Sequence, residues 1–343
     1  MWRKLWLFVL CLVLGTWTGL QICSTLQSAR FLSLIMGTAP RPFVYRCLVG
    51  LWLRAVNACL PVDAKHALVA WATLPYWNTV LRINHLAAVQ MPYVVAFVVT
   101  SALCFTGFGL CLFFLGEIFY PEMSFLERLL WISAGFALAN ATCSWRFYLY
   151  DPGTWLLFSL LLLVTFRRDW KWFWPVFILA TLNKETSLLV LPIVYQSESD
   201  LGVSPDTGSW IRRHRRSVAL FIVWLVLDLA IKFAYRHNPG PTYEWHLFDQ
   251  GLRFTSPSTN AQFAVIMGGM GIFVAYGWKS KPLVPRRAFS WTFVPMCLGM
   301  ATLGVFMETR AWYEMFPLAY WLAVPAVRDL GLKFWPKRGL VRV

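Results

Sequence analysis

Apolar runs recur along most of the chain, and short polar breaks separate them. Eight runs approach the length of a membrane span, near 5–21, 92–115, 128–143, 154–166, 217–235, 259–278, 288–307 and 311–327. A helix needs about 20 apolar residues to cross a bilayer. The pattern predicts an all-α, polytopic transmembrane protein with about 8–10 membrane segments. No break divides it clearly, so we interpret residues 1–343 as one transmembrane domain.

One further apolar stretch, 172–197, is interrupted by the polar sequence Asn183-Lys184-Glu185-Thr186. Basic clusters flank it at 167–171 and 212–216, and basic residues beside a span favour the cytoplasmic side. Two short arms, 172–182 and 187–197, would keep both clusters on that side. The pattern therefore favours a broken helical hairpin with the polar residues at its tip. The alternative is one kinked helix that violates the charge rule.

The composition excludes a soluble globular domain. Only 14% of the residues are charged and 58% are hydrophobic, whereas a soluble domain carries about 25% charged residues. The net charge of +15 comes from basic residues in the polar breaks, which is typical of topology signals and headgroup contacts. We therefore expect an integral membrane protein with cytoplasmic N- and C-termini, membrane lipids as partners and no nucleic acid.

The long segment 22–90 follows the first run and would lie on the outer face. Within it, 43–60 and 64–82 mix apolar residues with basic ones at helical spacing. Such segments are typical of amphipathic helices that lie on a membrane surface. Arg46 and Asp63 belong to this loop. Arg46 has a simpler interpretation as an interfacial side chain whose charged end reaches water.

Several polar residues gather on the same outer face in this topology, and ionisable groups at the edge of hydrocarbon are usually paired or functional. Lys184 can hold a phosphate as a point charge, and Glu185 can orient a cation or a sugar hydroxyl. Glu308 and Arg310 join the last two runs, where Arg suits phosphate and an interfacial salt bridge is the alternative. Asp151 precedes an apolar run, where its structural role would be a helix N-cap.

Two further observations limit the chemistry. Asp228 and Lys232 lie four residues apart inside one run, so they can form an ion pair on one helix face, with a proton or ion relay as the alternative. His and Cys show no metal-ligand spacing, so the sequence assigns no metal site and leaves the cofactor unknown, with a divalent metal still open.

Four segments together resemble the GT-C superfamily of membrane glycosyltransferases, especially its small bacterial members. They are Pro42–Arg46, Tyr150-Asp151 before an apolar helix that ends in Arg167-Arg168, Ala180–Pro192, and Glu308–Pro317. The resemblance spans roughly residues 40–320. It implies a polyprenyl-phosphate sugar as donor, transfer on the outer face of the bacterial inner membrane, and an inverting mechanism.

The resemblance also implies an acidic residue in the first outer loop, acting as a base or metal ligand. The one acid there is Asp63, which does not follow the first run closely; Asp151, Glu185 or Asp249 could substitute. Lys184, Arg310 and Arg46 would bind the donor phosphate, and Glu308 would belong to the same donor-binding site. We expect transfer to an envelope glycan, lipid or protein. Two alternatives stay open: a transporter or flippase for a lipid-linked or anionic solute, and a noncatalytic partner in an envelope assembly. Sugar, acceptor and oligomeric state are not determined by the sequence.

Overall fold

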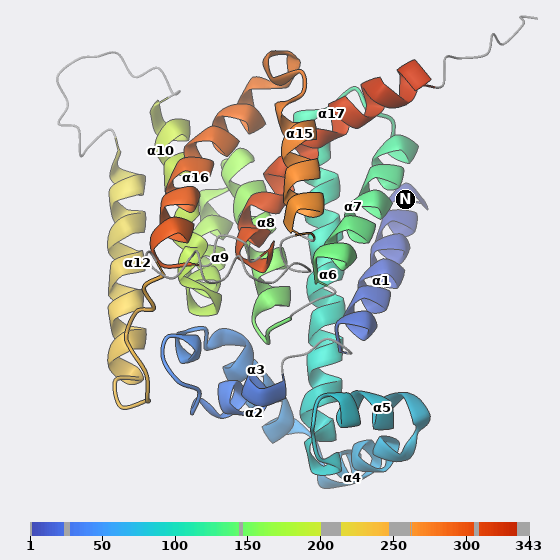
Figure 1. Ribbon diagram of the computed structural model, residues 1–343, viewed down its shortest axis with the longest axis vertical. Coiled ribbons are helices and arrows are strands. Elements are labelled where there is room, and N and C mark those ends of the chain that lie inside the picture. The colour runs from blue at the N-terminus through green and yellow to red at the C-terminus, as the bar shows by residue number, and fades with distance from the viewer. Residues whose placement is uncertain are drawn as a thin grey trace, which may run out of the picture.

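The computed structural model describes residues 2–23, 28–143, 147–199, 214–246, 261, 263–304 and 309–334. Within these ranges the chain is helical and contains no strand (Figure 1). The α-helices are α1 (Trp2–Cys23), α2 (Ser28–Met36), α3 (Leu48–Cys59), α4 (Val62–Ala70), α5 (Pro75–Ile83), α6 (Met91–Phe119), α7 (Phe125–Cys143), α8 (Asp151–Phe166), α9 (Trp170–Asn183), α10 (Leu191–Ser199), α12 (Arg215–Ala234), α15 (Gly269–Ala275), α16 (Leu283–Thr302) and α17 (Phe316–Phe334).

Short helices of other types connect several of these elements. A π-helix, η5 (Ala264–Gly268), leads into α15. The 3-10 helices are η1 (Phe43–Tyr45), η2 (Trp71–Thr73), η3 (Ala88–Gln90), η4 (Glu185–Val190), η6 (Trp278–Ser280) and η7 (Thr309–Met315).

Three helices in the described residues are long and apolar enough to cross a membrane: Trp2–Ile22, Ala88–Phe119 and Arg215–Ala234. Because the described residues form helices and no strand, the all-α prediction is confirmed for that part of the chain. The other predicted runs also form helices there, but these are shorter, less apolar or broken. The run predicted at 311–327 differs most, because it begins as the 3-10 helix η7 and continues as α17 to Phe334. Pro317 lies at the start of α17, where its fixed φ is tolerated.

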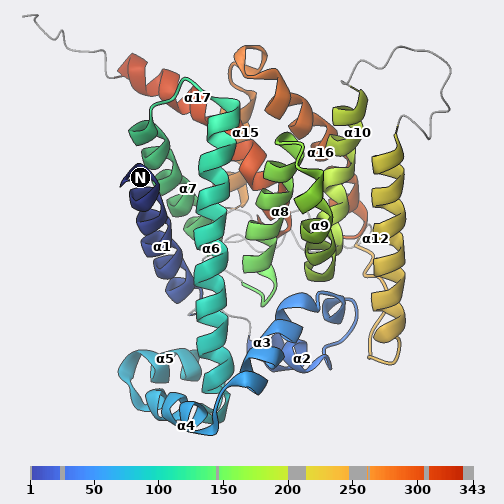
Figure 2. The ribbon, with the colours of Figure 1, turned by 180° about the vertical axis from the view of Figure 1, so that it is seen from behind.

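The long helix α6 lies beside α1 and α8 at the centre of the molecule (Figures 1 and 2). Gly15 and Gly19 permit the close approach of α1, since a Cβ at Gly15 would lie 2.5 Å from Thr106 Oγ1 and one at Gly19 would lie 3.0 Å from the Ala102 nitrogen. Small residues four apart allow such packing between membrane helices. Aromatic rings fill the other side of α6, where Phe108 contacts Trp155 at a centroid distance of 4.9 Å.

Residues 170–199 form two helical arms that run in opposite directions, α9 and α10, joined by η4 (Figures 1 and 2). α12 packs against both arms and against η4. The end of α8, the start of α9 and the start of α12 lie at the upper end of Figure 1. Lys184 and Glu185 therefore occupy the turn at the opposite end of the arms.

Helices α2 to α5 form a layer at the lower end of the molecule (Figure 1). The segments predicted as surface helices, 43–60 and 64–82, are helical and contain α3, α4 and α5; α3 buries Val49, Gly50 and Leu53, whereas α4 buries no residue. The loop after α12 is hydrogen-bonded to this layer: Asn238 Nδ2 donates to the carbonyls of Gly37 and Ala39, each at 2.9 Å. The Arg41 amide donates in turn to the Pro239 carbonyl at 2.7 Å.

Candidate functional site

The junction between α9 and η4 sends two adjacent charged side chains to different partners. α9 ends at Asn183, and Lys184 is extended, with φ −163° and ψ 134°. Adjacent side chains on an extended backbone point to opposite sides. Lys184 accordingly pairs with Glu314, and Glu185 pairs with Arg46. The two adjacent charges therefore pair with separate partners, because the backbone at Lys184 is extended.

Glu185 is held by a two-point contact with Arg46. Arg46 Nη2 donates to Oε1 at 2.8 Å and Nε donates to Oε2 at 3.3 Å. Nη1 of the same guanidinium donates to the Tyr150 hydroxyl. Burial alone would raise the pKa of Glu185, but the charge and hydrogen bonds of Arg46 overcome it and lower the pKa to about 2. Glu185 is therefore a carboxylate at neutral pH, and its side chain is still 42% exposed.

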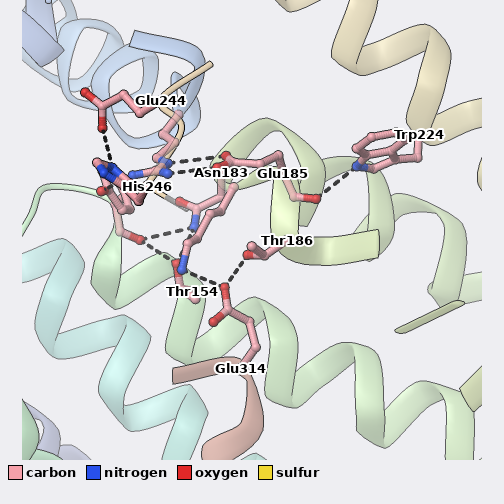
Figure 3. A network of polar contacts seen from close by, with 11 residues as sticks. Thr154, Asn183, Glu185, Thr186, Trp224, Glu244, His246 and Glu314 are labelled. Atoms are coloured by element: carbon pink, nitrogen blue, oxygen red, sulfur yellow. Dashed lines mark hydrogen bonds and ion pairs between the residues drawn. The ribbon is translucent and has the colours of Figure 1, made fainter. Parts of the chain in front are cut away.

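Lys184 forms a second pair, which is buried. Its Nζ lies 2.7 Å from Glu314 Oε1, and the two side chains are 10% and 1% exposed. Thr186 donates its hydroxyl to the same oxygen, as Figure 3 shows. Glu314 comes from η7, so this pair joins the turn to the segment that leads into α17. Since a buried charge is costly without its partner, the pair fixes the position of the turn.

Asn183 joins the turn to the start of α8. Its Nδ2 donates to the Tyr150 carbonyl and to Thr154 Oγ1, both at 3.1 Å (Figure 3). α12 is joined to the same turn from outside, because Trp224 Nε1 donates to the Glu185 carbonyl at 2.9 Å. Side chains and backbone groups of α8, α12 and the turn after α9, which are far apart in sequence, thus meet at the point where α9 ends.

A small cleft opens beside Glu185 against α12. It is lined by Pro42, Tyr45, Thr181, Glu185, Asp228, Ile231, Lys232, Thr242 and Tyr243. Lys232 Nζ lies 2.5 Å from Asp228 Oδ2 and donates to the Tyr243 hydroxyl at 2.7 Å, which confirms the predicted ion pair. The Tyr45 side chain lines the cleft and is buried, with 8% of the residue exposed, and its hydroxyl has no hydrogen-bond partner among the residues that the structure describes.

The predicted site residues do not all meet at this turn. Arg46, Lys184 and Glu185 do. Asp151 is buried nearby, but it is the first residue of α8 rather than its N-cap, which is Tyr150. Its Oδ2 accepts the Tyr148 amide at 2.8 Å, so the carboxylate stabilises the approach to the helix.

Asp63 is exposed in the first turn of α4, in the lower layer and apart from the turn (Figure 1). Arg310 belongs to η7 by its backbone, while its side chain lies outside the described residues, as do Glu308 and Asp249. Among the described residues, no three His, Cys, Asp or Glu side chains gather as metal ligands.

Sequence reasoning missed two important side chains, Glu314 and Tyr45. Glu314 carried a usable signal, because it is the one charged residue in the run 311–327, and such residues are usually paired or functional. Tyr45 carried none, since a tyrosine in an interfacial segment is ordinary.

Comparison with known proteins identifies no relative: no family model, curated protein or solved structure matches the chain.

Proposed function

We propose that the chain is a polytopic membrane protein of the bacterial inner membrane, and that it acts as a GT-C-like glycosyltransferase on the outer face. The polarity of α12 supports the membrane placement. Its buried residues are Ser217, Leu220 and Asp228, whereas Ile222, Val226 and Leu229 are exposed. Apolar side chains outside and polar ones inside suit a helix that faces lipid.

The distribution of basic residues supports the sidedness. The α8–α9 junction carries Arg167 and Arg168, α12 begins with Arg215 and Arg216, and these elements share the upper end of Figure 1. The positive-inside rule places that end in the cytoplasm. The cleft beside Glu185 then lies toward the outer face.

One observation carries the proposed activity: Arg46, Glu185, Asp228 and Lys232 from three separate segments line or border one cleft between apolar helices. A polyprenyl-phosphate sugar has an apolar tail and an anionic head, so it needs cations at the edge of lipid. We assign Arg46 and Lys232 to the phosphate. Lys184 is buried against Glu314, which favours a positioning role over the phosphate contact expected from the sequence.

The transfer step uses these groups as follows. An acceptor hydroxyl oxygen attacks the anomeric carbon of the sugar while the bond from that carbon to the phosphate oxygen breaks. The electron pair of that bond leaves with the polyprenyl phosphate, whose added negative charge Arg46 and Lys232 stabilise. The hydroxyl proton passes to a carboxylate of the cleft, for which we assign Glu185 and then Asp228. Binding of the phosphate would draw Arg46 from Glu185 and raise the basicity of this carboxylate.

The test is transfer by purified protein in lipid nanodiscs, with a panel of polyprenyl-phosphate sugars as donors and envelope glycans, lipids and peptides as acceptors. We expect E185Q, D228N and K232Q each to lower transfer at least tenfold, and E122Q, at an exposed acid outside the cleft, to leave it unchanged. Transfer that survives E185Q and D228N together would refute the assignment.

A second function is favoured by one feature, the Asp228–Lys232 pair inside the apolar helix α12. Such a pair suits a transporter or flippase for an anionic or lipid-linked solute. Movement of the labelled lipid across proteoliposomes without transfer would support it. Failure of both assays would favour a noncatalytic partner in an envelope assembly.

A further inference from the structure

A second and larger cavity lies away from the cleft, between α10, α12 and α16. Its volume is about 610 Å³, within the range of about 300–1,000 Å³ that is usual for ligand pockets. Its walls include Pro192 and Tyr195 from α10, Val218 and Phe221 from α12, and Trp291 and Val294 from α16. Figures 1 and 2 show α10 between the other two helices.

The walls of this groove are apolar and open to the outside. Phe221 and Trp291 are 44% and 54% exposed, although both are large hydrophobic side chains. The lining carries three hydroxyls: Ser217 near the start of α12, Ser290 in the first half of α16, and Tyr195 in the middle of α10. The rest of the lining is apolar.

Positive charge stands at the upper end of the groove. Arg215 is exposed one turn before Val218, and Arg287 is exposed one turn before Trp291. Residues three or four apart share a helix face, so both arginines continue the faces that line the groove. α12 and α16 also begin at this end (Figure 1), and the partial positive charge of a helix N-terminus favours an anion.

We propose that this groove binds an anionic phospholipid, with an acyl chain against Phe221, Trp291 and Val294 and the phosphate at Arg215 and Arg287. An apolar groove with cations at one end matches an amphiphile whose headgroup is negatively charged. The occupant differs from the donor of the proposed reaction. Arg215 and Lys232 are separated along α12 by about 25 Å at 1.5 Å per residue, so one headgroup cannot reach both.

The test is native mass spectrometry of the purified full chain, titrated with phosphatidylglycerol or phosphatidylcholine of the same acyl chains. We expect tighter binding of phosphatidylglycerol, and R215Q and R287Q should each reduce that preference about fivefold, since a basic residue near an anionic headgroup contributes about 1 kcal/mol. V218W should fill the groove and weaken binding of both lipids.

The matched control is R236Q, which removes an exposed arginine at the other end of α12 and should leave the preference unchanged. Thermal unfolding of each variant tests whether it is folded. An unchanged preference in the folded R215Q/R287Q double variant would overturn the proposal, as would displacement of bound phosphatidylglycerol by equimolar polyprenyl phosphate. These outcomes do not depend on transferase activity.

Discussion

Asn183 Oδ1 lies 2.4 Å from the position that a Cβ would occupy at Gly153. The side chain that joins the α9 turn to α8 therefore fits only because residue 153 lacks a side chain. The two positions are thirty residues apart in sequence, and the contact between them places Lys184 and Glu185.

Gly153→Ala should destabilise the protein by about 1–3 kcal/mol, since the new methyl group must displace Asn183 from Tyr150 and Thr154. The measurement is thermal unfolding in detergent. Gly299→Ala is the matched control, because the residue is inside helix α16 and, apart from the backbone of that helix, no atom of the described residues lies within 4 Å of the added Cβ. Equal stability of the two variants would contradict the role given to the Asn183 contact.

Removing one partner of the Lys184–Glu314 pair should cost about 3–5 kcal/mol, because the other charge stays buried. K184Q and E314Q should each show this loss, and the double variant K184M/E314L should recover part of it. Arg328 and Glu127 form a partly exposed pair at 3.6 Å, so R328Q should change stability by no more than about 1 kcal/mol. Additive single effects in the double variant would argue against direct coupling.

Stability should fall in acid through Glu185. Its pKa is lowered to about 2, below the usual carboxyl value of about 4.3, so the folded state favours the ionised form. This contribution is fully present above the usual value and is lost as the pH falls toward 2. R46Q should flatten the dependence of unfolding temperature on pH between about 5 and 3, whereas R328Q should not. A curve for R46Q parallel to that of the parent chain would show that the pair does not control this titration.

Tyr45→Phe should separate ligand binding from folding. The Tyr45 hydroxyl bonds to none of the described residues that line the cleft, so its removal should leave the unfolding temperature unchanged or slightly raised. If the donor or acceptor bonds this hydroxyl, KM should rise about fivefold, as expected for a lost hydrogen bond of about 1 kcal/mol. Y243F is the comparison, because that hydroxyl accepts from Lys232 and its loss should also lower stability.

Cys59 tests the orientation. It is a free, exposed cysteine on α3 in the lower layer. A membrane-impermeant maleimide should label it in intact cells that express the chain, and C59S should lose that label. Lys279→Cys in the C59S background places a thiol at the upper end, beside α16, and should react only after permeabilisation. The reverse pattern would place the cleft on the cytoplasmic side.

Much of the helical framework was predictable, because hydropathy acts locally. The apolar runs gave α6, α8 and α12 nearly at their observed positions, and the polar sequence Asn183–Thr186 correctly located the end of α9. The spacing of Asp228 and Lys232 gave their ion pair, since i,i+4 contacts depend only on helical geometry. Each of these predictions required information from a single segment.

The partners of the turn were harder to predict, because they depend on how distant helices pack. Sequence spacing did not show that Lys184 would meet Glu314, since Glu314 belongs to a 3-10 segment inside a run interpreted as one span. Asp63 is the one acid in the predicted first outer loop, but the fold places it on α4, which contacts α6 rather than the turn. In both cases the neighbours of the side chain depend on how separate helices pack, which the spacing within one segment does not show.

The bonds from Asn238 to Gly37 and Ala39 have a mechanical consequence. They couple the lower end of α12 to the connecting segment between α2 and α3, which carries Tyr45 and Arg46. A sideways displacement of α12 would therefore move the segment that carries Tyr45 and Arg46 with it, and would break the bonds that Trp224 and Arg46 make to Glu185. We expect the bulky amphiphilic donor of the proposed function to enter from the side that faces lipid. Entry would require α12 and the Tyr45–Arg46 segment to move outward together, rather than a separate lid to open.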